Sequence, residues 1–419
     1  MKVLGIVTEY NPFHNGHKYH IQESIKLCSA DYVVSVMSGN FIQRGEPAIV
    51  NKWSRTHMAL NEGVDLVLEL PVIYAMSSAE FFSFGAVKIL DSLGIVDYIC
   101  FGSESGNIRQ LDLIAEILSD EPEEYTQLLK KYLDSGLSFP SAREKALSDY
   151  FSQHLVRIDN ISEIMSSSNN ILGVEYLKAI KRLKSPIVPK TIPRIGNTYN
   201  TGYVTGNISS ATSIRKSFSK ANHNLVSDIL EQTMPKRCIE ILKQEIDSGR
   251  GPILPENFES IILAFLRKMS SEEIAAMPYV NEGLENRIKL SASVSGTLNE
   301  LIEAISTRRY PKTRIQRILF YSLIGISDKE FKLFNNHGGP QYIRVLGFNS
   351  KGRHLLSLIK EKARLPIIVK TANFKNHCNP LVSRMLEIES NSTDLYVLGF
   401  SNPEYRKAGQ EYTNNVVIM

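Results

Sequence analysis

Short apolar segments alternate with amphipathic ones through the N-terminal half of the chain, and this alternation limits the fold more than any other feature. Each apolar segment is rich in Val, Ile and Leu and is too short for a helix. The predicted strands span residues 2–7, 31–37, 65–70, 96–101 and 187–195. Strands that are apolar on both faces belong to parallel sheets with helices on each side, so we expect a Rossmann-like, doubly wound α/β domain.

The pattern changes near residue 220. Helical spacing dominates from there, as at 238–246, 258–269 and 294–305. Two alternating stretches predict short strands in a small α/β tail, at 341–348 and 365–370. We therefore divide the chain into residues 1–215, an α/β nucleotide-binding catalytic domain, and residues 216–419, a mainly helical domain with that tail.

The composition is that of a globular protein, with 43% hydrophobic and 22% charged residues. No apolar run approaches the ~20 residues of a membrane span, and the N-terminus lacks the longer apolar stretch of a secretory signal. We therefore expect a soluble cytoplasmic protein without a membrane partner. The absence of a Cys-x-x-Cys pair argues against structural zinc and a disulfide framework among the four cysteines, Cys28, Cys100, Cys238 and Cys378.

The most informative motif is His14-Asn15-Gly16-His17, directly after the first predicted strand. Ligands of open parallel sheets bind beyond the carboxyl ends of the strands, where helix N-termini favour anions. The two imidazoles can face one phosphate chain, and Gly16 lets the backbone come close to it. By spacing alone the pair is also compatible with zinc ligands or surface histidines. Its place after the first strand favours a triphosphate.

This motif resembles the His-x-Gly-His signature of the nucleotidyltransferase superfamily. Residues 208–215, Ile-Ser-Ser-Ala-Thr-Ser-Ile-Arg, resemble the later Ser/Thr-rich phosphate motif of that superfamily. Within it, the chain is most similar to the bacterial tRNA(Met) cytidine acetate ligase family, over essentially its full length. The segments that carry the resemblance are 5–17, 38–47, 65–71, 101–104 and 169–173. The resemblance implies a sheet of the nucleotidyltransferase type.

It also implies a ligase that condenses acetate with ATP to acetyl-adenylate and then acetylates N4 of the wobble cytidine of elongator tRNA(Met). Mg²⁺ is expected with the ATP. The expected catalytic residues are His14, His17 and Lys18, with Arg215 as a further source of positive charge. The implied ATP contacts are Val7, Thr8, Glu9, Tyr10, Asn11, Pro12, Phe13, His14, Asn15, Gly16, His17, Lys18, Tyr19, His20, Gly102, Asn169 and Arg194.

Two other functions remain compatible with the motif. A nucleotidyltransferase could join a nucleotide to a phosphorylated small molecule, although such an enzyme would not need the long helical extension. An RNA-binding module that senses nucleotide would keep its function without His14 and His17.

Basic residues cluster with aromatic ones in the C-terminal half of the chain. Lys and Arg neutralise phosphates, and guanidinium or aromatic planes stack on unpaired bases. A solvated helix face is the alternative interpretation, and the net charge of +4 does not decide between them. The expected tRNA contacts are Arg308, Arg309, Lys312, Arg314, Lys351 and Arg353.

Overall fold

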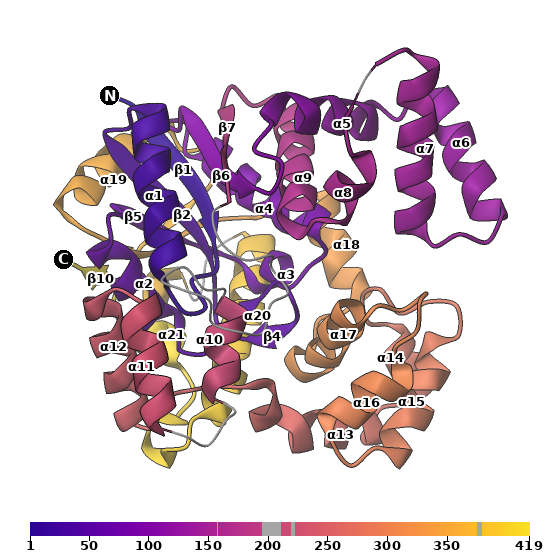
Figure 1. Cartoon of the computed structure of the whole chain (residues 1–419). Helices are drawn as coiled ribbons and strands as arrows, with labels where there is room; N and C mark the ends of the chain where they lie inside the picture. Colours follow the sequence, from indigo (N-terminus) through magenta and orange to yellow (C-terminus); the bar gives the residue numbers. More distant parts are fainter. Residues whose placement is uncertain (157, 195–210, 219–222, 375–378) are drawn as a thin grey trace.

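One large sheet lies between two sets of helices in the computed structural model (Figure 1). The structure describes residues 1–156, 158–194, 211–218, 223–374 and 379–419, with the backbone alone at 223–227 and 374. The strands of the sheet are β1 Val3–Thr8, β2 Tyr32–Ser38, β5 Leu66–Leu70, β6 Tyr98–Ser103, β7 Val188–Pro193, β8 Ile343–Phe348, β9 Ile367–Ile368 and β10 Val417–Ile418. Their order is β10-β8-β5-β2-β1-β6-β7, and β9 pairs with β8.

The order of the N-terminal strands creates a switch point beside β1. The chain moves outward from β1 through β2 to β5 and then returns to the other side of β1 with β6 and β7. These strands pair in parallel, which confirms the prediction of a doubly wound sheet. In such sheets ligands bind in the crevice at the carboxyl ends of the two strands where the order reverses, here β1 and β6.

Helices cover both faces of this sheet. They are α1 Asn15–Cys28, α2 Lys52–Asn61, α3 Val72–Ala75, α4 Ala79–Ser92, α5 Ile108–Asp120, α6 Glu123–Asp134, α7 Phe139–Gln153, α8 Ile161–Ser166, α9 Ser168–Leu183 and α19 Ser350–Lys362. Alternate residues of β1 face opposite cores, because side chains of a strand point in turn to its two sides. Leu4 and Ile6 pack in the core that holds α1 and α2, whereas Val3 packs in the core that holds α4, α9 and α19.

The rest of the chain is mainly helical, as the sequence predicts. In Figure 1 the groups α10–α12 and α13–α17 lie below the sheet. The bounds are α10 Ala211–Phe218, α11 His223–Thr233, α12 Lys236–Asp247, α13 Glu259–Lys268, α14 Ser271–Ala275, α15 Leu284–Val294, α16 Leu298–Ile305, α17 Lys312–Ile324, α18 Asp328–Asn336, α20 Pro380–Tyr396 and α21 Gln410–Thr413, with 3-10 turns at Pro255–Phe258, Thr371–Phe374, Val397–Gly399 and Pro403–Tyr405. Among the described residues, no helix combines the length and apolar character that crossing a membrane needs.

The C-terminal strands do not form a tail of their own. β8 pairs antiparallel with β5, in a register that sets Arg344 opposite Glu69, and β9 and β10 pair with β8. These strands satisfy backbone groups that β5 would otherwise leave unpaired at the edge of the sheet. The boundary expected near residue 215 therefore separates two kinds of sequence but does not divide the sheet.

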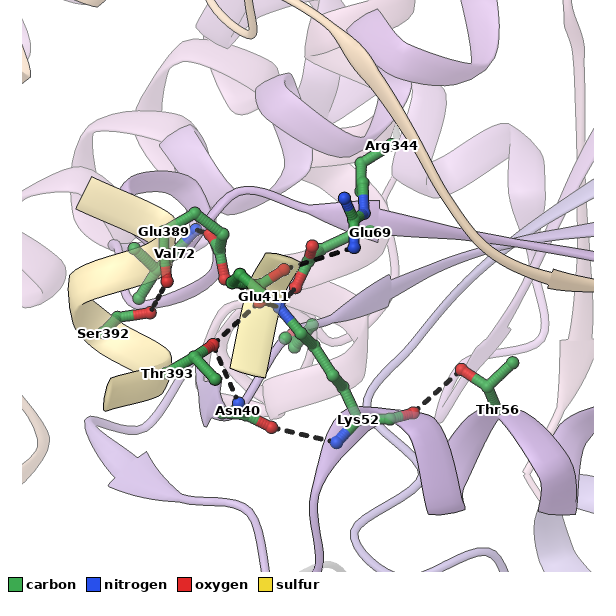
Figure 2. A network of polar contacts seen from close by, with 12 residues as sticks. Asn40, Lys52, Thr56, Glu69, Val72, Arg344, Glu389, Ser392, Thr393 and Glu411 are labelled. Atoms are coloured by element: carbon green, nitrogen blue, oxygen red, sulfur yellow. Dashed lines mark hydrogen bonds and ion pairs between the residues drawn. The ribbon is translucent and has the colours of Figure 1, made fainter. Parts of the chain in front are cut away.

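A buried charge network joins the C-terminal elements to the N-terminal ones (Figure 2). The Nζ atom of Lys52 lies 2.5 Å from Glu69 Oε1 and 3.5 Å from Glu389 Oε1, and it also contacts Glu411. Arg344 donates to Glu411 over 3.2 Å. Burial, with repulsion from Glu389, raises the pKa of Glu69 well above its usual range. Because the ammonium of Lys52 occupies the space among the three carboxylates, this cluster contains its own cation.

Candidate active site

A cavity of about 240 Å³ lies beyond the carboxyl ends of β1, β6 and β7, at the switch point of the sheet. Residues of α1 form one wall of the cavity, and residues of α4 and α9 form the wall across the sheet edge from it. The expected ATP contacts that line it are Val7, Thr8, Glu9, Tyr10, Asn11, His14, Gly16, His17, Tyr19, His20, Gly102, Asn169 and Arg194. The structure thus brings together residues from both ends of the N-terminal half.

His14 and His17 form a capping box at the start of α1. The Nδ1 atom of His14 accepts the N–H of Gly16 over 3.0 Å, and the Nδ1 atom of His17 accepts the N–H of His14 over 3.2 Å. The two rings stack with their centroids 3.7 Å apart. Since each Nδ1 is an acceptor, a neutral ring carries its proton on Nε2. Each imidazole therefore keeps an Nε2–H group that can donate to a ligand.

Burial keeps these rings neutral. It lowers the pKa of His14 to about 3, together with the positive charges of Arg194 and Arg215. The pKa of His17 is also lowered well below its usual range, by burial and by the neighbouring His14 and His20. The pKa of His20 falls to about 4 because of burial and Arg194. At neutral pH the wall contributed by α1 thus offers hydrogen-bond donors without adding charge.

Permanent positive charge among the described residues of the cavity wall comes from three arginines, Arg44, Arg194 and Arg215. Arg194 follows β7 and donates from Nη1 to Asn169 Oδ1 over 3.2 Å. Arg215, on α10, donates from Nη1 to the carbonyl of Asn11 over 2.8 Å and lies 3.4 Å from Glu46. The first turn of α1 has no acidic residue, so its positive dipole end is not offset there. Together these groups favour an anion.

Glu104 fixes the N-terminus of α9 beside this site. Its Oε1 atom accepts the side chain of Asn169 over 2.7 Å, and its Oε2 atom accepts the N–H of Asn170 over 2.8 Å. Asn169 in turn holds the guanidinium of Arg194. A Cβ atom at Gly102 would lie 3.4 Å from Arg194 Cγ and 3.9 Å from His20 Cδ2. One part of the cavity is therefore lined by Gly102, His20 and Arg194.

Four expected residues of the 7–20 loop do not line the cavity. Lys18 pairs with Glu62 over 2.9 Å, so the structure does not place its ammonium with the two histidines as a catalytic group. The ring of Phe13 is fully buried and packs on Tyr10, and the amide of Asn15 donates to the carbonyl of Gln232. The fourth residue is Pro12. These residues shape the loop without reaching its ligand side.

The cavity wall also includes residues outside the expected ATP contacts. Gln43 and Arg44 belong to the polar loop after the second predicted strand, for which the sequence leaves open a role at the acetate, a nucleotide contact or a plain turn. The structure places them on a hairpin formed by β3 Phe41–Ile42 and β4 Glu46–Pro47. Phe82, Phe101, Leu172 and Tyr176 also line the cavity. The later phosphate motif contributes Ala211, Thr212 and Arg215, while its residues 208–210 lie outside the described residues. Apolar wall residues give no local signal, because they are indistinguishable in sequence from the core.

The six residues expected to bind tRNA form two separate clusters. Figure 1 places the start of α17, with its preceding loop, at the lower right and α19 at the upper left. Four of the six lie at 308–314, and Lys351 and Arg353 lie in the first turn of α19. Lys351 donates from Nζ to the carbonyl of Asp31 over 3.1 Å.

Three residues of the first cluster have protein partners. Arg309 pairs with Glu282 over 2.5 Å, and Lys312 lies 3.9 Å from Glu303. Arg314 is half-buried and donates to the carbonyl of Tyr279 over 2.6 Å, so its guanidinium stabilises the fold through this hydrogen bond. Arg308 is exposed. Within this cluster, Arg308, Arg309 and Lys312 are the better candidates for a phosphate contact.

Comparison with known proteins assigns the family. The model of the HIGH nucleotidyl transferase family matches residues 1–411. A tRNA(Met) cytidine acetate ligase of Acetivibrio thermocellus is 56% identical over 419 residues, covering 100% of each chain. That of Caldanaerobacter subterraneus subsp. tengcongensis is 47% identical over 402 residues, covering 96% of each. The chain belongs to the tRNA(Met) cytidine acetate ligase family of HIGH nucleotidyl transferases.

Solved structures of the family have the same fold over the whole chain. The crystal structure of apo Thermotoga maritima TmcAL has a TM-score of 0.95 at 37% identity, with 100% of each chain covered. The structure of that protein bound with alpha-thio ATP has a TM-score of 0.93, again at 37% identity and with 100% of each chain covered. The nucleotidyltransferase fold with helical additions is therefore common to this family.

Proposed function

We propose that the chain is an ATP-dependent ligase that forms acetyl-adenylate from acetate and ATP and then acetylates N4 of the wobble cytidine of elongator tRNA(Met). The observation that carries the proposal is the stacked, neutral pair His14–His17 at the switch point of the sheet, with both Nε2–H groups left to donate. The name and the ATP analogue of the family members support the same activity.

In the first step an acetate oxygen attacks the α-phosphorus of ATP. The bond between that phosphorus and the bridging oxygen breaks, and pyrophosphate leaves with the electron pair. Negative charge then increases on the non-bridging oxygens, so catalysis rests on positioned donors and cations. His14 and His17 donate from Nε2 to these oxygens. Arg194 and Arg215 stabilise the pyrophosphate as it leaves.

Mg²⁺ is expected to accompany the ATP. Glu9 is the only carboxylate among the described residues of the cavity wall, and its Oε1 atom already accepts the N–H of Gln43 over 2.8 Å. Mg²⁺ is usually bound through substrate phosphates, waters and one or two carboxylates. This donor set does not form a dedicated protein site for the ion, and no step of the proposal depends on one.

In the second step the N4 amine of the cytidine attacks the acetyl carbon. The bond from that carbon to the phosphate oxygen breaks, AMP leaves with the electron pair, and the amine gives up one proton. Glu9 is the base that we assign to this proton, because it lines the cavity and burial raises its pKa above the usual range. A base in an anticodon loop can leave its stack and enter such a pocket.

The direct test incubates the protein with ATP, labelled acetate and bulk tRNA. Label should remain on tRNA and should be lost with His14→Asn or His17→Gln. These two changes keep a capping side chain at each position while removing the Nε2–H donor. His354→Gln, on the exposed side of α19, is the control for losing a histidine. Label found only on a soluble nucleotide product would instead support the nucleotidyltransferase alternative and refute the ligase.

The tRNA surface needs its own test because the basic clusters lie apart. Charge reversal of Arg308 and Arg309 together should weaken tRNA binding and lower its salt dependence, while ATP binding stays unchanged. The same reversal of Lys351 and Arg353 measures the second cluster. A loss of ATP binding without a loss of tRNA binding would contradict the assignment of either cluster.

A further inference from the structure

The two walls of the cavity differ in chemistry. The wall from α1 carries His14, His17 and His20 and lies close to Gly102 and Arg194. Apart from Asn169 at the start of α9, the wall across the sheet edge is apolar and consists of Phe82 from α4 and Leu172 and Tyr176 from α9, with Phe101 from β6. The rings of Phe101 and Tyr176 lie 5.5 Å apart, and both are almost fully buried. The three histidines lie only on the first wall, so a different part of the substrates meets the apolar side chains of the second.

A rigid hairpin brings polar groups to this cavity. Gln43 donates its N–H to Glu9 Oε1 over 2.8 Å and its side chain to the carbonyl of Ser77 over 3.2 Å. Gly45 has a φ of +75°, and a Cβ atom there would lie 2.6 Å from the Cα atom of Arg317. The hairpin is therefore pressed against α17 with no room for a side chain at its turn. This packing fixes the backbone of Arg44, whose side chain lines the cavity.

We propose that the apolar wall and the hairpin form the carboxylate pocket, in which Arg44 pairs with the acetate carboxylate while Phe82, Leu172 and Tyr176 enclose its methyl group. This inference rests on the proposed function, since it names the place of the acid in the same reaction. Arg44 supplies the one full positive charge of the hairpin within the cavity wall. The apolar side chains limit the length of the acid, because a longer alkyl chain would overlap them.

The adenine ring is the other group that could lie against aromatic side chains. Gly102 favours a different position for the adenine ring. It has no side chain, so the backbone beside His20 and Arg194 is accessible to a nucleotide on the phosphate side of the cavity. A nucleotide that binds along the histidines, Gly102 and Arg194 leaves the opposite wall to the second substrate. The two placements predict different kinetics, because only a wall that surrounds the acid affects the choice between acids.

The experiment measures acid-dependent pyrophosphate release with acetate, propionate and butyrate. Phe82→Ala and Leu172→Ala enlarge the pocket, and the kcat/KM ratio of propionate to acetate should rise about 10-fold or more, as expected when one methylene gains space. The KM for ATP should change by less than about threefold, which is well below the roughly 10-fold change expected in the preference between acids. Phe81→Ala is the matched control, since its ring packs on Phe331 at 4.7 Å and does not line the cavity.

Each outcome decides the inference. A higher KM for ATP in Phe82→Ala, with an unchanged preference among acids, would place adenine on this wall and overturn the proposal. Arg44→Gln should raise the KM for acetate at least about tenfold, the value of one charge-assisted hydrogen bond. If Phe82→Ala fails to fold, Leu172→Ala decides, because Leu172 is only half-buried. A wild-type protein that activates no acid would refute the proposed function itself, whereas wild-type activity with unaltered selectivity in both variants would refute this inference alone.

Discussion

Replacing His14 with Asn tests whether the imidazoles of the cavity are neutral. The folded pKa of His14 is about 3, below the unfolded value of roughly 6.5. Between these two pKa values the unfolded chain is protonated at His14 and the folded protein is not. The contribution of His14 to the free energy of unfolding is therefore complete above pH 6.5 and is lost as the pH falls toward 3. Between pH 7 and pH 5 this linkage lowers the free energy of unfolding by about 2 kcal/mol for one such histidine.

Urea unfolding followed by circular dichroism at pH 7, 6 and 5 measures this loss. Asn is a good N-cap, so His14→Asn keeps an acceptor for the first N–H groups of α1 while it removes the titrating imidazole. The loss of unfolding free energy between pH 7 and pH 5 should be about 2 kcal/mol smaller in the variant than in the wild type. His354→Gln serves as the exposed control. Equal losses in His14→Asn and the wild type would refute the claim that burial keeps His14 neutral.

Three further predictions follow from the same contacts. Arg194→Gln should weaken ATP binding about 10-fold or more by calorimetry, whereas Lys18→Ala should have little effect because Lys18 pairs with Glu62 outside the cavity. Lys52→Met should lower the free energy of unfolding by about 3–5 kcal/mol in denaturant titrations, since it leaves buried carboxylates without their cation, and Glu69→Gln should cost less. Acetyl-adenylate formation should keep its rate from pH 8 to pH 6, because His14 has a pKa of about 3, and a fall centred near pH 6.5 would contradict a neutral pair.

The N-terminal strands could be predicted because each carries its own signal. A segment that is apolar on both faces is recognisable within itself, as β2 and β5 show. The pairing of β8 with β5 could not be predicted in this way. It depends on the register that sets Arg344 opposite Glu69, and no local pattern reports a partner so far along the chain. The position of the strands predicted for the C-terminal tail therefore depends on their pairing with β5, which is distant in sequence.

The candidate site shows the same division between local and distant information. The motif at 14–17 is contiguous, and its place after β1 was enough to predict a phosphate site. His14, His17 and His20 recur every third residue and so share one side of α1. Lys18 is only one residue further than His17, but a helix turns about 100° per residue, and this rotation directs Lys18 away from the cavity to Glu62.

The buried network and the cavity are connected through the loop after β2. A Cβ atom at Gly39 would lie 2.6 Å from Glu69 Oε1 and 3.0 Å from Glu389 Oε1, so this loop packs directly on the network. Arg55, which is fully buried, donates to the carbonyls of Glu9 and Gly39 and thereby ties the same loop to the end of β1. The hairpin that carries the proposed acid-binding arginine begins directly after this loop. Glu389 of α20 and Glu411 of α21 therefore hold the loop beside the cavity in place although they do not line the cavity. This is possible only because the C-terminal part of the chain returns to the sheet that carries β1.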